Sequence, residues 1–151
     1  METRFVIEIE ASVETVFYWV VQPEAVLQWL DHLTAYEFTN EGDEWVGTTV
    51  HQVWDDDEDS ALTGTITAFE EHKHFTIELE GGKFTVTVDY QFEDMGEKTR
   101  LTQETEFTYK GMTKVIEKTM GAKVKQSYEA QAKSNFARLM DLCEVDERIE
   151  E

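Results

Sequence analysis

Residues 112–144, MTKVIEKTMGAKVKQSYEAQAKSNFARLMDLCE, decide the fold that this sequence predicts. Apolar residues recur in this segment at helical spacing, so it predicts one unbroken amphipathic helix, about 50 Å long at 1.5 Å per residue. A lone helix cannot bury its apolar stripe, and only the strands that precede it can cover that stripe. A curved antiparallel sheet around one long helix leaves space between the two, so a ligand cavity is the leading hypothesis. The stripe that should face the sheet consists of Val124, Tyr128, Ala132, Asn135, Leu139 and Leu142, with Phe136 and Cys143 at its edge.

Alternating segments before this helix predict about seven strands. They are residues 4–10, 35–40, 45–54, 62–69, 75–80, 84–92 and 100–109. Two short helices, residues 13–21 and 23–30, follow the first strand; Ser12 caps the first and Pro23 begins the second. We expect turns at 41–43, at an acidic hairpin tip over 55–60, at 70–73, at Gly81-Gly82 and at 95–97. No repeat or linker interrupts the pattern, which predicts a single α+β domain over residues 1–151.

Period-two alternation assigns the two faces of the strands. The more polar set of the last strand, which should face solvent, is Thr102, Glu104, Glu106 and Thr108. The inward set is Val46, Thr48, Val50, Gln52, Trp54, Phe75, Ile77, Leu79, Phe84, Val86, Val88, Tyr90, Phe92, Leu101, Gln103, Thr105 and Phe107.

Charge and composition exclude several classes of partner. The net charge is −20, from 33 acidic and 13 basic residues, and a field of this sign repels the phosphates of nucleic acids and anionic membrane surfaces. No stretch approaches 18 apolar residues, so membrane insertion is not expected. The first residues, METRFVIEIE, lack the basic start and apolar run of a signal peptide, and Cys143 is the only cysteine. We therefore expect a cytoplasmic location.

One segment carries the opposite charge. Residues 110–138 hold seven basic side chains against two acidic ones. This face of the helix could meet the acidic sheet of a second copy, which leaves a homodimer open.

Four segments together resemble a known superfamily. They are residues 5–17 (FVIEIEASVETVF), Gln22-Pro23-Glu24 followed by Trp29, residues 45–48 (WVGT) and residues 63–70 (TGTITAFE). They resemble the START-like (Bet v 1-like, SRPBCC) superfamily, and most of all the branch that groups polyketide cyclases/dehydrases with homologues of the Hsp90 ATPase activator. The resemblance implies the helix-grip fold, in which a curved antiparallel sheet wraps around the C-terminal helix and a cavity lies between them.

Given such a cavity, the polar residues on inward apolar faces are the candidate ligand contacts. Asn135 lies in the middle of the helix stripe, where it either faces a ligand or bonds Gln103, a tyrosine or a trapped water and fixes the helix register. The tyrosines and tryptophans in the set could equally be core residues with satisfied polar atoms. The full candidate set is Trp29, Gln52, Trp54, Tyr90, Phe92, Gln103, Tyr128 and Asn135.

Motifs for catalysis or metal binding are not found in the sequence, so we expect no cofactor and no metal. The pair His72 and His74 falls at a predicted acidic turn and reads as a surface pair. The run 55–59 fails the EF-hand pattern, because Ser60 stands where glycine is needed and Ile66 where glutamate is needed. Asp31 and His32 could form an acid–base couple at the cavity mouth. Acidic neighbours should raise the pKa of the Cys143 thiol.

Three classes of function follow. The first is binding of a hydrophobic or amphipathic small molecule, lipid or polyketide-like, without catalysis. The second is a polyketide cyclase/dehydrase-type enzyme, which would need an acid or base inside the cavity, whereas the inward set is nearly all neutral. That argument depends on strand register, because a slip of one residue would turn His51, Glu104 and Glu106 inward. The third is a protein-interaction module of the Hsp90-activator type. Because only the second class is enzymatic, the sequence leaves enzymatic activity open.

Overall fold

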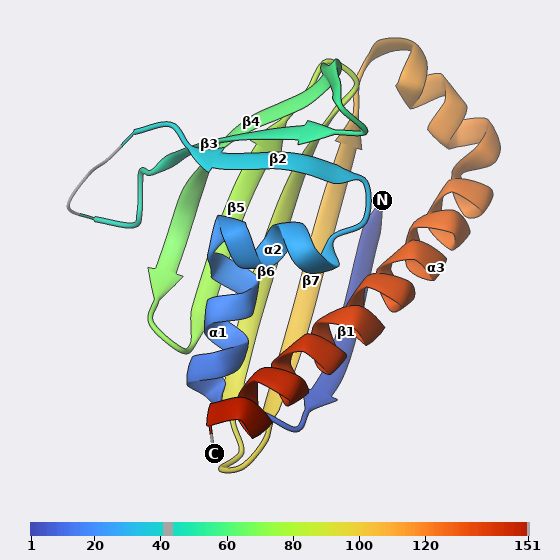
Figure 1. Cartoon of the computed structure of the whole chain (residues 1–151). Coiled ribbons are helices and arrows are strands. Elements are labelled where there is room, and N and C mark those ends of the chain that lie inside the picture. The colour runs from blue at the N-terminus through green and yellow to red at the C-terminus, as the bar shows by residue number, and fades with distance from the viewer. Residues whose placement is uncertain (41–43, 151) are drawn as a thin grey trace.

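The chain folds as one curved antiparallel sheet that grips a long C-terminal helix, as the resemblance predicts (Figure 1). The computed structural model describes residues 1–40 and 44–150, without the side chains of residues 112–120 and 148–150. The predicted turn at 41–43 therefore lies outside the described residues. The elements are β1 (Glu2–Ile9), α1 (Val13–Val21), α2 (Pro23–Trp29), β2 (Leu33–Phe38), β3 (Thr49–Trp54), β4 (Asp57–Glu70), β5 (His74–Glu80), β6 (Phe84–Asp94), β7 (Thr99–Tyr109) and α3 (Gly111–Glu150).

The seven strands follow the order β1-β7-β6-β5-β4-β3-β2, with every neighbouring pair antiparallel. β1 pairs with β7, and β2 to β7 pair in sequence order as a meander. In this register Gln103 of β7 lies between Phe5 of β1 and Tyr90 of β6. The three side chains therefore share the inner face, while Glu104 and Glu106 are exposed on the outer face, so the register predicted for β7 is confirmed.

The two short helices are fixed by local chemistry. The Ser12 hydroxyl accepts the backbone N–H of Thr15 at 3.4 Å and caps α1, and Pro23 occupies the first turn of α2. The indole N–H of Trp29 donates to the backbone carbonyl of Trp19 at 2.8 Å in a buried contact. This bond ties the end of α2 to α1, and the two helices lie beside the C-terminal half of α3 (Figure 1).

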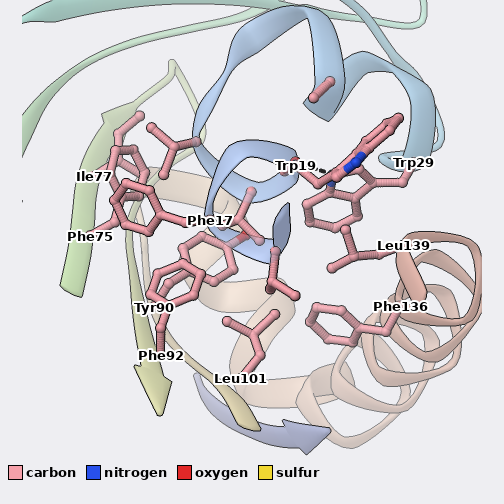
Figure 2. Packing of buried hydrophobic residues seen from close by; sticks show 14 of the residues in the cluster. Phe17, Trp19, Trp29, Phe75, Ile77, Tyr90, Phe92, Leu101, Phe136 and Leu139 are labelled. Atoms are coloured by element: carbon pink, nitrogen blue, oxygen red, sulfur yellow. Dashed lines mark hydrogen bonds between the residues drawn. The ribbon is translucent and has the colours of Figure 1, made fainter. Parts of the chain in front are cut away.

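The core lies between the inner face of the sheet and the three helices (Figure 2). Of the predicted stripe of α3, Ala132, Asn135 and Leu139 are buried, whereas Val124, Tyr128 and Leu142 are half-buried. Phe136 and Cys143, predicted at its edge, are also buried, and the Phe136 ring lies 5.5 Å from that of Phe5. The helix thus meets the sheet along its C-terminal half. No helix in the described part of the chain is long and apolar enough to cross a membrane.

Strand β3 begins later than predicted. Trp45 stacks on Phe69 with ring centroids 4.5 Å apart, and Gly47 takes a left-handed φ of 94° that interrupts an extended backbone. The strand therefore starts at Thr49. Val46, predicted to face inward, is 51% exposed.

The acidic hairpin tip is shorter than predicted. Asp55 and Asp56 have φ values of 56° and 55°, and Trp54 pairs with Asp57, so two residues make the turn. Aspartate tolerates this left-handed conformation, and residues 57–60 extend β4 instead of forming a loop. Thr102, predicted to face solvent, is buried, because its short side chain lies between Val6 of β1 and Gln91 of β6 on a central strand.

Candidate functional site

A cavity of about 490 Å³ lies between the inner face of the sheet, α2 and α3. Its wall is mostly apolar, with a few polar side chains. Aromatic side chains are prominent in it, and Trp29, Phe75, Tyr90 and Phe136 are labelled in Figure 2. The lining residues are Val20, Val26, Trp29, Leu30, Asp31, His32, Tyr36, Gln52, Trp54, Asp55, Ser60, Leu62, Phe75, Ile77, Leu79, Phe84, Val86, Val88, Tyr90, Gln103, Phe107, Tyr128, Gln131, Ala132, Asn135 and Phe136.

The candidate ligand contacts named from the sequence meet in this wall, with one exception. Phe92 does not line the cavity; its ring packs edge-on against Phe17 at 4.9 Å between centroids. The residues brought together are Trp29, Gln52, Trp54, Tyr90, Gln103, Tyr128 and Asn135.

Gln103 and Tyr90 form a buried polar pair on the sheet side of the cavity. Each is 6% exposed, and the Gln103 amide Nε2 donates to the Tyr90 hydroxyl at 2.9 Å. Burial raises the pKa of Tyr90, so its hydroxyl stays protonated. The Gln103 Oε1 atom is buried and has no hydrogen-bond partner among the described residues.

A second polar group lies on β2 and β3. The indole N–H of Trp54 donates to Gln52 Oε1 at 3.2 Å. Burial raises the pKa of Tyr36, and a hydrogen bond with Gln52 partly offsets this. Tyr36 was not among the candidates named from the sequence. It could have been found, because it alternates with Phe38 along one strand, and the same alternation identified Tyr90 and Gln103.

Tyr128 supplies a hydroxyl from α3. Burial raises its pKa, while hydrogen bonding to Thr105 and Thr3 opposes the shift. Its ring meets that of Phe107 edge-on at 5.1 Å. Thr3 and Thr105 also bond each other across β1 and β7, so this tyrosine is anchored to the sheet.

Asn135 connects α3 to the segment that follows α2. Its Oδ1 accepts the backbone N–H of Asp31 at 3.3 Å and the amide of Gln131 at 3.2 Å. Gln103, one of its proposed partners, bonds Tyr90 instead. The contacts of the Asn135 oxygen therefore favour the reading in which this residue fixes the helix.

Charged groups gather at the cavity mouth. His32 Nδ1 lies 2.7 Å from Asp55 Oδ1, and His32 Nε2 lies 3.6 Å from Asp31 Oδ2. The hydrogen bond to Asp55, the charge of Asp55 and that of Asp31 raise the pKa of His32, which is half-exposed. The sequence placed Asp31 beside His32, but Asp55 is 23 residues away and reaches it only because the Asp55-Asp56 turn folds back.

The remaining histidines and the cysteine lie outside the cavity wall. His74 lies on β5 against Asp89, at 2.5 Å, whereas His72 packs edge-on against the Phe17 ring, so the two do not form a joint site. The described residues contain no group of three or more metal-ligating side chains placed to hold an ion. Cys143 is buried, and burial, with the charges of Asp146 and neighbouring glutamates, raises its pKa as expected.

Comparisons with known proteins agree with this architecture. The model of the family described as "polyketide cyclase / dehydrase and lipid transport" matches residues 2–141. No curated protein sequence matches the chain.

Solved structures share the fold at low sequence identity. The Zhui aromatase/cyclase of Streptomyces sp. R1128 superposes with a TM-score of 0.73 at 8% identity, covering 95% of this chain and 93% of that one. A START superfamily protein of Mycobacterium smegmatis gives 0.70 at 16% identity over 93% and 98% of the two chains. A protein of Thermus thermophilus gives 0.71 at 16% identity over 93% and 95%. At these identities the likeness establishes the fold alone.

Proposed function

The chain belongs to the polyketide cyclase/dehydrase and lipid-transport family, and from that premise we propose that it binds a hydrophobic or amphipathic small molecule, lipid or polyketide-like, without catalysis. The observation that carries the proposal is the cavity of about 490 Å³. An apolar pocket of this size with a few placed polar side chains is the usual design of a small-molecule site.

The chemistry of the inner wall supports binding rather than catalysis. Its polar side chains, Gln52, Tyr90 and Gln103, are neutral, and burial keeps the tyrosine protonated. The nearby acids Glu104 and Glu106 point to the opposite face of the sheet. The inner wall can therefore hold a ligand by its shape and by hydrogen bonds, but its described residues offer no general acid or base whose pKa suits catalysis at neutral pH.

A thermal-shift screen against fatty acids, sterols, flavonoids and aromatic polyketides tests the proposal. A ligand at 100 times its dissociation constant should stabilise the protein by about 2.7 kcal/mol. Val88→Phe, on the inner face of β6, should remove the shift by filling the cavity, whereas Thr87→Phe on the outer face should keep it. A screen without any saturable shift would contradict the proposal.

One observation favours a cyclase/dehydrase-type enzyme as a second candidate. The bond between Asp55 and His32 Nδ1 orients an imidazole at the cavity mouth, where it could exchange a proton with the edge of a bound molecule. Turnover of a compound found in the screen, abolished in His32→Asn, would support this candidate. Binding without turnover would support a carrier.

The interaction-module alternative stays a prediction. The large exposed apolar side chains that a partner could contact each belong to a different helix, strand or loop; they are Val6, Tyr18, Leu27, Val46, Met95 and Val145.

The homodimer also remains a prediction. Lys123, Lys125, Lys133 and Arg138 are exposed on α3, as a docking face requires, whereas Lys110 is paired with Glu80 at 2.7 Å. Size-exclusion chromatography at low and high salt tests it, and a monomer at both would rule it out. The single-domain organisation and the cytoplasmic location likewise stay predictions.

A further inference from the structure

We propose that the sheet side of the cavity selects ligands with a neutral hydroxyl group and rejects carboxylates, through the pair Gln103 and Tyr90. The inference deepens the proposed function and rests on it.

Gln103 carries a polar atom that is unpaired in the described part of the chain. Gln103 Oε1 is buried and accepts no hydrogen bond from the described residues, although Gln103 lines the cavity. An amide oxygen removed from water without a donor is unfavourable, and buried oxygens of this kind are nearly always paired. A ligand that brings an O–H or N–H to this atom supplies the missing donor.

Tyr90 complements it. Its hydroxyl oxygen accepts the Gln103 Nε2 hydrogen at 2.9 Å, which leaves its own proton free to donate. The two residues are direct partners in the register of β6 and β7, so the backbone ladder holds them side by side. One acceptor next to one donor matches a hydroxyl group, because a hydroxyl donates and accepts at once.

Charge excludes the carboxylate. The lining residues include no lysine or arginine within the described chain, and the carboxylates among them are Asp31 and Asp55 at the mouth. His32, the one basic side chain in the wall, already bonds Asp55. A carboxylate beside Gln103 would lose its hydration, face the unpaired Oε1 and meet no counter-charge.

The rest of the wall indicates the skeleton that bears the hydroxyl. Aromatic rings from the sheet, α2 and α3 surround the cavity, among them Trp29, Phe75, Phe107 and Phe136. Aromatic side chains pack well against flat rings, in offset-stacked or edge-on contacts. The ligand class is therefore a neutral phenol or ring alcohol on an apolar ring system.

Four probes with one skeleton test the inference by calorimetric titration at pH 7: 4-phenylphenol, 4-methoxybiphenyl, biphenyl-4-carboxylate and biphenyl. The phenol should bind about tenfold more tightly than the methyl ether, as expected for a buried hydrogen bond. The carboxylate should bind more weakly than the ether. Gln103→Leu should reduce the preference for the phenol over the ether to about twofold or less. Gln91→Leu, the same substitution on the exposed face of β6, should leave it unchanged.

The outcomes separate the two proposals. Binding of biphenyl and the ether as tightly as the phenol, or a preference that survives in Gln103→Leu, would overturn the inference and leave the proposed function standing. If none of the four probes binds and the wider screen is also silent, both fail. Tyr90→Phe is the second variant. It should weaken binding of the phenol and leave the affinity for biphenyl unchanged.

Discussion

The indole N–H of Trp29 donates to the backbone carbonyl of Trp19 at 2.8 Å, in a contact buried between α1 and α2. In a continued helix that carbonyl would accept the N–H of residue 23, but residue 23 is proline and has none. The indole therefore satisfies a carbonyl that the sequence itself leaves without a helical donor. Because Trp29 also lines the cavity, the same side chain joins the two helices and forms part of the candidate site.

Trp29→Phe should destabilise the protein by about 1–3 kcal/mol, because the Trp19 carbonyl is then buried without a donor. Urea unfolding followed by circular dichroism measures this. Trp54→Phe is the matched control, since the Trp54 indole bonds the Gln52 side chain in a half-buried position. Equal losses of stability in the two variants would contradict the role given to the Trp29 bond.

Asn135→Leu separates the two readings of the polar residue in the α3 stripe. If Asn135 mainly holds the Asp31 backbone, the substitution should destabilise the protein by about 1 kcal/mol. The loss is small because Asp31 is exposed, so water can bond the N–H that loses its partner. Ligand affinity should then stay within about twofold. Chemical unfolding and titration with a ligand from the screen measure the two effects. Gln131→Leu removes the other bond to the same oxygen and serves as the control for the stability measurement. A large loss of affinity with unchanged stability would instead place Asn135 against the ligand.

The fold could be predicted from the sequence because its signals are local and periodic. The 3.6-residue repeat of α3 and the alternation of β5 to β7 each depend on neighbours within one element. The same alternation placed Gln103 and Tyr90 on the inner face. Phe92 shares that face, yet its ring packs against Phe17 from α1, and no pattern within β6 shows where α1 will lie.

The pairing of His32 with Asp55 at the cavity mouth could not be predicted, because it too depends on residues outside a single element. His32 and Asp55 both have left-handed φ values, 71° and 56°, and the Asp55 N–H donates to the His32 carbonyl at 2.7 Å. Their pairing depends on two local backbone conformations and on the register of β2 against β3. The acidic run 55–59 suggested a solvated loop, and only the two-residue turn brings Asp55 to the histidine.

The raised pKa of His32 predicts how this pair affects stability with pH. Since the folded pKa lies above the ordinary value of 6.5, the pair stabilises the folded state fully below that value, and the effect is lost as the pH rises through the folded pKa. Proton NMR titration should show the raised pKa, and Asp55→Asn should lower it. The stability difference between wild type and His32→Asn should shrink over the same pH range; asparagine is chosen because it tolerates the left-handed backbone. A His32 pKa that is unchanged in Asp55→Asn would show that the carboxylate does not cause the shift.

Cys143 should be unreactive in the folded protein. The side chain is fully buried, and burial together with Asp146, Glu144 and Glu147 raises its pKa, so the reactive thiolate is scarce at neutral pH. A disulfide reagent such as Ellman's should label it slowly in buffer and rapidly in urea. The unfolded thiol ionises first, from about pH 8.5, so stability should fall as the pH rises above that value. This decline should be smaller in Cys143→Ala, which lacks the thiol. Fast labelling of the native protein would mean that the C-terminal half of α3 separates readily from the sheet, and the cavity would then lack the rigid wall that the proposed binding requires.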